Sequence, residues 1–525
     1  MTHVITGSCC NDAACVPACP VNCIHPTPEE REYVASEMLY IDPDTCIDCG
    51  ACADVCPVSA VVPDYDLEVG DEPFEALNAA WYADPGHATY STTSARSPVV
   101  TTERPGPLRV AVVGTGPAAS YVVDALLSIR ELAAEVTVIE RLLTPGGLIR
   151  HGVAPDHAGT KAVGEGFNRT LRRPGVSVRL GLEFGTDVTA DELLSAHHAV
   201  VVASGAAGGR ALGIPGESLR GVHSAVDFVG WYNGHPDHAD RTFDLGSERA
   251  VVVGNGNVAL DVARVLLAPH ESLRTTDIAA HALDALADSA VREVVVVGRR
   301  GADHAAFTAG ELIRLGQTPG LDLVAHDAEI VAGATDPITR FKMDRLRAIA
   351  AASAHASSER RVVFRFGLRP IEAKGFGRVA MLSFESSAGE EEIDTGLVLS
   401  AIGYRATPVP GLPFDPDRAV VPNVLGRVGE NSGVYVAGWL KRGPSGGIGT
   451  NKWCAMETVS TLVADHEAGR LSEPSRADLH LDLPGLGLSA WDAIDRHERD
   501  RGRAEGRPRV KVADAWEQRV IGVEK

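Results

Sequence analysis

Nine of the ten cysteines in this chain of 525 residues lie between Cys9 and Cys56. The later of two runs reads CIDCGACADVCP and spaces Cys46, Cys49 and Cys52 three residues apart, with a fourth cysteine and a proline behind them. The pattern C-x2-C-x2-C-x3-C-P is typical of iron–sulfur proteins with two clusters, in which the fourth cysteine ligates the other cluster. Zinc sites take C-x2-C pairs from separate segments, so the spacing favours a cluster over zinc.

The first run, SCCNDAACVPACP, repeats this pattern with one substitution. Aligned on Cys19, which also precedes a proline, the same intervals fall on Cys15, Asp12 and Cys9, so a carboxylate stands at the middle thiolate position. Together with the crossing Cys56, Cys9 and Cys15 supply three thiolates, enough for a [3Fe-4S] cluster. Cys19 crosses in the other direction and completes a [4Fe-4S] site with the later run: Cys46, Cys49 and Cys52.

Two alternatives remain at the first site. Asp12 could complete a second, labile [4Fe-4S] cluster through an oxygen ligand, or it could be a solvated loop acid. Cys10 competes with Cys9 as a ligand, although its spacing is one residue short. Cys23 fits no ligand position, and we expect it to be a free thiol near a cluster.

A dinucleotide-binding pattern begins at Leu108, where an apolar stretch leads into Gly114-x-Gly116-x-x-Ala119 and a helical pattern. The glycines allow a tight turn and a close approach of the backbone to a pyrophosphate, which binds at the helix N-terminus. A second apolar stretch ends at Glu140, 26 residues after the first glycine, where an acid can bind ribose hydroxyls.

The same pattern recurs at Gly254-x-Gly256-x-x-Ala259. The apolar stretch that follows this unit ends in Arg299 and Arg300, where an NAD-dependent enzyme would carry an acid. Guanidinium groups match phosphate oxygens, so the two arginines favour the 2′-phosphate of NADPH. Two such units in one chain indicate a flavoprotein that binds FAD in the first and NADP(H) in the second.

The elements that carry these residues imply several domains. We expect a two-cluster domain over 1–62, an acidic linker rich in Ser, Thr and Pro over 63–107, and an FAD-binding domain in two parts, 108–213 and 400–525. An NADP-binding domain over 214–399 is inserted between these parts. A short helix within the linker, FEALNAAWYAD, is expected to pack on the cluster domain.

Composition narrows the function classes. The net charge is −21, and residues 1–107 carry 17 acidic and 3 basic side chains, which argues against nucleic-acid and anionic-membrane binding. The chain shows no apolar stretch long enough to span a membrane and no leader at its start, so a cytoplasmic location is expected. Cys454 is the single cysteine of the larger part, which excludes disulfide-reductase chemistry; we expect it to be buried and inert.

Several stretches resemble known families. Residues 1–62 resemble bacterial seven-iron ferredoxins. The stretches TPGGLIRHGVAPDH, GNGNVALDVAR, AAFTAGEL and AGWLKRGPSGGIGTNK resemble adrenodoxin reductase and its bacterial ferredoxin–NADP reductase relatives over 108–525. The whole chain is thus similar to the actinobacterial ferredoxin/ferredoxin–NADP reductase fusions. This resemblance implies an α/β flavoprotein with two Rossmann-like domains behind an α+β ferredoxin domain.

The resemblance also implies site residues. Many FAD proteins have Gly-Asp at the end of a late strand, whereas here Trp439 follows Gly438. His157 and Glu311 are candidate catalytic residues, with His157 tuning protonation near the flavin. The expected FAD contacts are Gly114, Gly116, Ala118, Ala119, Glu140, Gly147, Leu148, Val188, Gly438, Trp439, Gly446, Gly447 and Ile448. The expected NADP contacts are Gly254, Asn255, Gly256, Asn257, Val258, Arg299, Arg300, Glu311 and Gly446.

The expected activity is that of a ferredoxin–NADP reductase. NADPH would reduce FAD by hydride transfer, and single electrons would pass to the fused clusters, to separate ferredoxins or to downstream redox enzymes. The acidic ferredoxin domain is expected to dock on a basic surface of the reductase or of an outside acceptor. Two alternatives are an electron-input subunit like the small subunit of glutamate synthase and a non-catalytic redox-sensing cluster protein.

Overall fold

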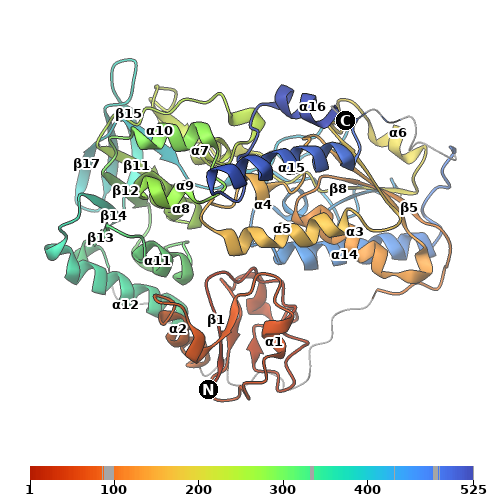
Figure 1. Cartoon of the computed structure of the whole chain (residues 1–525), viewed down its shortest axis with the longest axis horizontal. Helices are drawn as coiled ribbons and strands as arrows, with labels where there is room; N and C mark the ends of the chain where they lie inside the picture. Colours follow the sequence, from red (N-terminus) through yellow and green to blue (C-terminus); the bar gives the residue numbers. More distant parts are fainter. Residues whose placement is uncertain are drawn as a thin grey trace.

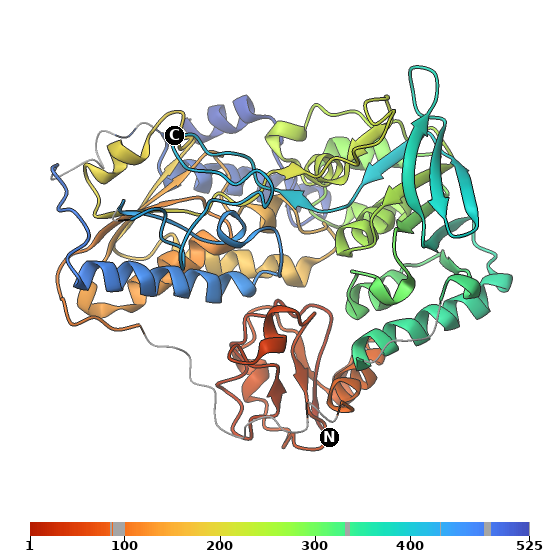
Figure 2. The same cartoon turned by 180° about the vertical axis from the view of Figure 1, so that it is seen from behind.

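The structure is a computed structural model that describes residues 1–84, 87, 100–330, 336–430, 432–476, 483 and 485–523. A small cysteine-rich unit lies below the boundary between two larger units, each built around a parallel sheet (Figure 1). Figure 2 shows the same arrangement from behind. Among the described residues, no helix combines the length and apolar character needed to cross a membrane.

The cysteine-rich unit consists of two small antiparallel sheets and two helices. β1 pairs with β4, and β2 pairs with β3. These pairings bring the two cysteine runs close together. The short helix α1 lies within the second cysteine run. The bounds are β1 (His3–Ile5), β2 (Ile24–His25), β3 (Tyr40–Ile41), α1 (Ala51–Asp54), β4 (Val61–Pro63) and α2 (Pro73–Tyr82).

Helix α2 lies within the segment expected to be a linker, and it packs on the cysteine-rich core as anticipated for that stretch. Asn78 ties it to two strands: its Oδ1 accepts from the amides of Ile5 (3.2 Å) and Ile41 (2.9 Å), and its Nδ2 donates to the carbonyl of Ile5. Leu77 and Trp81 are buried in the same core. The folded unit therefore continues through α2. Residues 88–99 of the expected tether lie outside the described residues.

The first large unit is a five-stranded parallel sheet in the order β20-β8-β5-β6-β7. Its valine-rich strands are buried on both faces, as parallel sheets require. Helices α3, α14 and α15 cover one face. The bounds are β5 (Arg109–Val113), α3 (Pro117–Ser128), β6 (Glu135–Glu140), α4 (Leu148–His151), α5 (Ala158–Thr170), β7 (Val176–Leu180), β8 (Ala199–Val202), β20 (Val434–Val436), α13 (Trp439–Arg442), α14 (Thr450–Glu467) and α15 (Leu488–Glu505).

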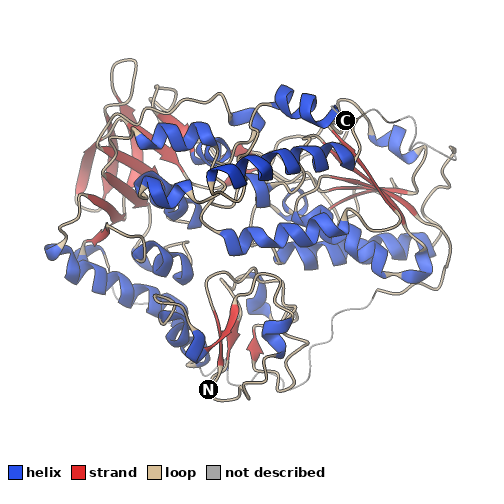
Figure 3. Ribbon diagram, viewed as in Figure 1, coloured by secondary structure: helices blue, strands red, loops and turns tan. Residues whose placement is uncertain are grey.

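The second large unit is a six-stranded parallel sheet in the order β10-β18-β11-β12-β14-β13. Helices cover one face, and a three-stranded antiparallel sheet covers the other (Figure 3). The bounds are β10 (Val222–Ser224), α7 (Ala225–Tyr232), β11 (Arg249–Val253), α8 (Asn257–Leu267), α10 (Ala280–Ala287), β12 (Glu293–Gly298), α11 (Ala309–Gly316), β13 (Leu321–Ala325), α12 (Pro337–Ala352), β14 (Arg360–Phe366), β15 (Arg369–Lys374), β16 (Met381–Ser386), β17 (Gly389–Asp394) and β18 (Leu397–Ser400).

The second sheet is inserted into the first. The chain leaves the first sheet after β8, builds all six strands of the second, and returns to the first at β20. The two crossings pair with each other, because β9 (Gly208–Gly209) and β19 (Tyr404–Arg405) form a short antiparallel ladder. The expected fold class, a flavoprotein-type α/β fold with two dinucleotide-binding units behind a small α+β unit, is confirmed.

The cysteine-rich unit contacts the second large unit through α2. Phe74 and Leu77 share one apolar core with Ile313 of α11 and Ile338 of α12. Beside this core, Glu37 Oε1 lies 2.6 Å from Lys342 Nζ, while its other oxygen accepts from the amide of Ala309 at 2.7 Å. The centre of this contact is thus apolar, and Lys342 supplies a positive charge beside it.

Candidate functional site

The first cysteine run folds around a small cavity. Cys9, Asp12 and Cys15 line it together with Cys56 from the second run, which brings together the donor set expected for the first cluster. Cys10 also lines the cavity, so Cys9 and Cys10 both remain candidates. Burial raises the pKa of the Cys9 thiol to about 11, and the neighbouring Cys56 and Asp12 add to this rise. Three thiols and a carboxylate around one cavity fit an iron–sulfur cluster.

Tight backbone turns produce this convergence. The residues on either side of Asp12 have left-handed conformations, with φ of 58° at Asn11 and 56° at Ala13. A non-glycine residue in this region is uncommon, and two around one position curl the loop so that its side chains face inward. Asp12 Oδ1 accepts from the amide of Ala14 at 3.2 Å, which holds the carboxylate within the loop.

The second site brings together a different set of cysteines. The Sγ atoms of Cys19 and Cys23 lie 3.4 Å apart, and the Cys23 thiol is also close enough to Cys46 for that cysteine to raise its pKa. The hydrogen bond from Cys23 lowers the pKa of Cys19 to about 5. Burial raises the pKa of Cys52 to about 11, with Cys46 and Cys19 as neighbours. Cys23 thus lies directly against the second site. Cys49 is exposed.

The first site meets the larger part of the chain at a glycine turn. The amide of Gly449 donates to the carbonyl of Cys10 at 2.8 Å. A Cβ atom at Gly449 would lie 2.0 Å from the carbonyl oxygen of Asn11, so only glycine fits this contact. Lys452 Nζ donates to the carbonyl of Asp12 at 3.3 Å. The cysteine run therefore rests on the turn that contains Gly446, Gly447 and Ile448.

The residues expected to bind the flavin lie at the carboxyl edge of the first sheet. Gly114 has a φ of +105°, and a Cβ there would lie 2.7 Å from the carbonyl oxygen of Ala203. Gly116 and Gly147 approach so closely that a Cβ on Gly147 would lie 2.9 Å from the Gly116 Cα. Glu140 ends the neighbouring strand and accepts from Thr115 Oγ1 at 2.6 Å. This edge combines glycines, which allow a pyrophosphate to approach the backbone, with a carboxylate that can bind ribose hydroxyls. A dinucleotide-binding site needs both features.

Other predicted flavin contacts surround this edge. Ala118 on the first turn of α3 lies against Gly438, and Leu148 begins α4. Trp439 begins α13 half-buried, with its Nε1 donating to the carbonyl of Ser445 at 3.1 Å, so it is not a core tryptophan. Val188 is buried in the apolar cluster under the opposite face of the sheet.

Cys454 was expected to be buried, and it is. It also contacts Gly438, one of the residues expected to bind the flavin. Its Sγ accepts from the amide of Gly438 at 3.2 Å. No sequence pattern pointed to this contact, because Cys454 lies on α14 and Gly438 follows a strand.

The second sheet presents the residues expected to bind NADP. Gly254 follows β11 with a φ of +123°, and open space surrounds the Cα of Gly256 at the N-terminus of α8. β12 lies beside β11, so Arg299 and Arg300 emerge at the same edge, and both are exposed. Among the described residues, neither arginine takes part in an ion pair, which leaves both guanidinium groups available to a phosphate.

The asparagines of this motif have structural partners. Asn257 Oδ1 accepts from the amide of Thr308 at 2.8 Å, and the carbonyl of Asn255 accepts from the amide of Phe307 at 2.7 Å. Both bonds tie the glycine turn to the segment before α11. Val258 contacts the core clusters of both large units and so lies at their boundary.

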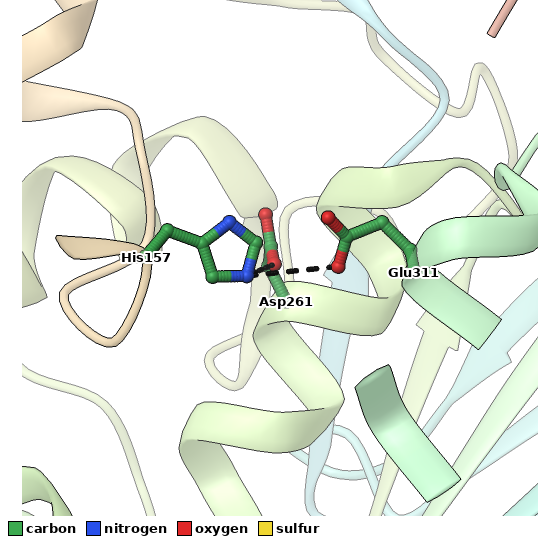
Figure 4. A group of neighbouring side chains, drawn as sticks. All are labelled: His157, Asp261 and Glu311. Atoms are coloured by element: carbon green, nitrogen blue, oxygen red, sulfur yellow. Dashed lines mark ion pairs between the residues drawn. The ribbon is translucent and has the colours of Figure 1, made fainter. Parts of the chain in front are cut away.

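The two candidate catalytic residues meet at this boundary. Figure 4 shows His157 directed toward Asp261 and Glu311, with its Nε2 atom 3.5 Å and 3.6 Å from their carboxylates. His157 comes from the first large unit, while Asp261 lies on α8 and Glu311 on α11 of the second. Burial lowers the pKa of His157 to about 4, and burial together with Asp261 raises the pKa of Glu311 to about 7.

Arg264 occupies the centre of this group. Its Nη2 lies 2.5 Å from His157 Nε2 and 2.6 Å from Asp261 Oδ1, while its Nε and Nη2 donate to Asp156. A guanidinium can only donate, so His157 accepts through Nε2 and carries its proton on Nδ1. His157, Asp261 and Glu311 could together hold a metal ion by geometry alone, but the arginine already supplies the positive charge. Sequence reasoning missed Asp156, Asp261 and Arg264.

A further cavity lies elsewhere. It has a volume of about 870 Å³ and opens at the amino edge of the second sheet, between Arg249, Glu293 and Arg361. Glu293 forms ion pairs with both arginines across neighbouring strands. The cavity is thus separate from the cradle residues, which lie at the carboxyl edge.

Comparison with known proteins identifies relatives of both parts of the chain. Residues 108–445 match the family described as pyridine nucleotide-disulphide oxidoreductase, and residues 8–60 match the 4Fe-4S dicluster domain. A protein of Mycobacterium tuberculosis named "Probable ferredoxin/ferredoxin–NADP reductase" is 48% identical over 98% of this chain and 94% of its own length. Its counterpart in Mycobacterium leprae is 46% identical over 99% of this chain and 98% of its own length.

A solved structure is also similar. The structure of Mycobacterium tuberculosis FprA in complex with NADPH aligns with a TM-score of 0.76 and 39% identity. It covers 80% of this chain and all of its own.

Proposed function

This chain belongs to the ferredoxin/ferredoxin–NADP reductase family, and from that membership we propose that it oxidises NADPH and passes the electrons one at a time to iron–sulfur centres. When bound, FAD converts hydride chemistry into single-electron transfer, and the clusters accept single electrons. One contact carries the proposal. The amide of Gly449, in the turn expected to hold the flavin, donates to Cys10 in the first cysteine run.

We assign the cofactors to the cradles described above. FAD would lie along Gly114, Gly116, Gly147 and Glu140, with Trp439 and the turn from Gly446 to Ile448 beside its ring. NADP(H) would lie along Gly254 and Gly256, with its 2′-phosphate on Arg299 and Arg300. The exposure of both arginines and the bare glycine edges support these assignments.

We further propose one [3Fe-4S] cluster on Cys9, Cys15 and Cys56 and one [4Fe-4S] cluster on Cys19, Cys46, Cys49 and Cys52. The gathering of the first three thiols around one cavity, with Asp12 at the fourth position, supports the first assignment. The proximity of Cys19, Cys46 and Cys52 supports the second.

His157 and Glu311 would control protons beside the reacting rings. His157 is neutral and holds its proton on Nδ1, because Arg264 donates to Nε2. Glu311 changes its charge near pH 7 because it is buried beside Asp261. A pair of groups with separated pKa values at the boundary between two nucleotide-binding units is typical of a site that positions charge for transfer.

The domain division proposed for this activity is a ferredoxin domain over 1–62 that α2 extends, an FAD domain in two parts, 108–213 and 400–525, and an NADP domain over 214–399. The insertion of the second sheet between β8 and β20 supports it. Separate ferredoxins are proposed as further acceptors, and the reducing cytoplasm as the location, since the cysteines serve as cluster ligands.

The test is anaerobic purification with assay of FAD and of its reduction. We expect one FAD per chain, bleaching of the flavin by NADPH in strong preference to NADH, and reduction of a ferredoxin or cytochrome c without any partner subunit. Protein that lacks FAD, or flavin that NADPH leaves oxidised, would contradict the proposal. Activity only with a large partner would favour the electron-input subunit.

A further inference from the structure

Asp12 is the position at which the first cysteine run departs from its own pattern, and both of its carboxylate oxygens face polar groups of the protein. Oδ1 accepts from the amide of Ala14 at 3.2 Å. Oδ2 lies 4.0 Å from Lys452 Nζ, which also donates to the Asp12 carbonyl at 3.3 Å. The Asp12 side chain is 14% exposed, so solvent screens this pair only partly.

Lys452 comes from the reductase, 440 residues along the chain, and several contacts fix its position. It lies in the first turn of α14, directly after the Gly449 contact with Cys10. The next residue, Trp453, packs edge-on against Tyr33 of the ferredoxin domain, with ring centroids 6.2 Å apart. The Tyr33 hydroxyl donates to the carbonyl of Asn11 at 2.6 Å. Lys452 is therefore held against the Asp12 loop by docking of the two domains.

We propose that Lys452 determines how many irons the first cluster holds, by competing with a fourth iron for the Asp12 carboxylate. The inference rests on the proposed cluster assignment. An ammonium group at this distance neutralises the carboxylate and repels a ferrous ion that would bind there. The reductase would thereby keep the cluster beside its flavin in the three-iron form.

Uptake of a fourth iron needs no electron beyond the one that reduces the three-iron cluster. A three-iron cluster reduced by one electron, with a core charge of zero, takes up one ferrous ion and becomes a [4Fe-4S] core of charge two plus. No further electron is transferred, and an Asp12 oxygen supplies the bond that the missing thiolate would have made. Without Lys452, that oxygen is free of its competing cation.

The experiment compares full-length wild type with Lys452→Met under anaerobic conditions. Each protein is reduced with dithionite, incubated with increasing ferrous ion, freed of excess iron and reoxidised with a mild oxidant. The EPR signal of the oxidised three-iron cluster and the iron count per FAD are then measured. We expect Lys452→Met to lose the signal and gain one iron at a ferrous concentration about tenfold lower than wild type.

Three further variants test whether the effect comes from the positive charge of Lys452. Lys452→Arg keeps the positive charge and should behave like wild type. Lys374→Met removes a lysine from the exposed strand β15 and should also behave like wild type. The double variant Asp12→Ala with Lys452→Met lacks the oxygen ligand and should keep the three-iron signal, because the gain in iron depends on the carboxylate.

Two results would overturn the inference. One is equal ferrous dependence in wild type and Lys452→Met. The other is an as-purified wild type that already holds eight irons and shows no three-iron signal, since the fourth position would then be filled beside the lysine. Dithionite replaces NADPH here so that the iron result stays readable if NADPH fails to bleach the flavin, which would contradict only the proposed activity.

Discussion

The two cysteine runs share a pattern and a small domain, yet their surroundings differ. The first site lies against the reductase, with Cys10 and Cys15 each about 95% buried and the Gly449 turn hydrogen-bonded to its loop. The second site faces away, with Cys49 exposed and the neighbouring Ile47 58% exposed. Two sites built by one motif thus have different neighbours: the first contacts the Gly449 turn of the reductase, and the second faces solvent.

Charge follows the same division. The segment of the second run contains Asp42, Asp44, Asp48 and Asp54 and no basic residue. The first run instead receives positive charge from the reductase through Lys452. Under the proposed function, the docked side would deliver electrons from the reductase, and the acidic side would receive an outside acceptor with a basic surface.

Removal of the exposed Cys49, a proposed cluster ligand, should have the largest effect. In Cys49→Ala we expect reduction of an outside ferredoxin or cytochrome c by NADPH to fall by at least about a hundredfold, because the centre that faces the acceptor is displaced or lost. NADPH should still bleach the flavin, and the EPR signal of the first cluster should remain. Stopped-flow and steady-state assays measure these rates, with Tyr65→Phe, exposed in the same domain, as the control. A wild-type rate in Cys49→Ala would show that electrons leave by another route.

A methyl group at Gly449 should weaken the contact between the first cysteine run and the reductase. In Gly449→Ala the new Cβ would meet the carbonyl of Asn11, so the first loop must move away from the reductase. We expect electron transfer from reduced flavin to the clusters to slow about tenfold to a hundredfold, with hydride transfer from NADPH unchanged. Rapid-mixing spectroscopy separates the two steps.

The control for this variant is Gly310→Ala on α11, where a Cβ would lie 3.5 Å from the Gly7 Cα, an ordinary contact. FAD content must be equal in both variants, since Gly449 adjoins the cradle. Unchanged cluster reduction in Gly449→Ala would contradict the docking described above.

Changes at His157 and Glu311 should affect the two cysteine sites equally. The pKa values of these two residues also predict how the stability of the fold depends on pH. The pKa of Glu311 is about 7 in the folded protein, above its ordinary value, so this group destabilises the fold as pH rises from about 4.5 through 7. His157, whose folded pKa of about 4 is depressed, acts in the opposite sense and removes stability as pH falls from about 6.5 to 4. Glu311→Gln should therefore raise the melting temperature relative to wild type at pH 8 but not at pH 5.

The same variant should remove a step near pH 7 from the rate of flavin reduction by NADPH, with a change of a few-fold. The reduction of the two clusters should slow together, because this pair acts before either of them. A selective effect on one cluster would contradict its place at the nicotinamide side. Asp303→Asn, exposed near the same motif, is the control.

Salt concentration should have the smallest effect on electron-transfer rates, and this effect should differ most clearly between the two cysteine sites. Reduction of an outside acceptor at the acidic second site should slow a few-fold between about 0.01 M and 0.15 M salt, where the screening length shortens from about 30 Å to about 8 Å. Transfer between flavin and first site, which is covered, should not change. Asp44→Asn with Asp54→Asn should flatten the salt dependence. Equal salt dependence of the two rates would remove the distinction between the sites.

Local chemistry could be predicted from the sequence. Cysteines three residues apart, glycines before a helix and paired arginines after a strand each act within one turn, so their spacing alone indicates the ligand that they fit. The three-thiolate interpretation of the first run used only such intervals, and the structure does bring Cys9, Cys15 and Cys56 together. A short helix was also predicted over FEALNAAWYAD, residues 74–84, and α2 spans Pro73–Tyr82.

Only the tertiary structure decided which cysteine site faces the reductase, what opposes the Asp12 carboxylate and which groups surround His157. Lys452 and Asp12 are 440 residues apart, and Arg264 reaches His157 across 107 residues. Such pairs depend on how whole domains dock, and docking is set by summed apolar contacts and bare backbone such as Gly449. A motif specifies what it can bind because its atoms are neighbours in the chain, whereas its partners are chosen by surfaces that form only after folding.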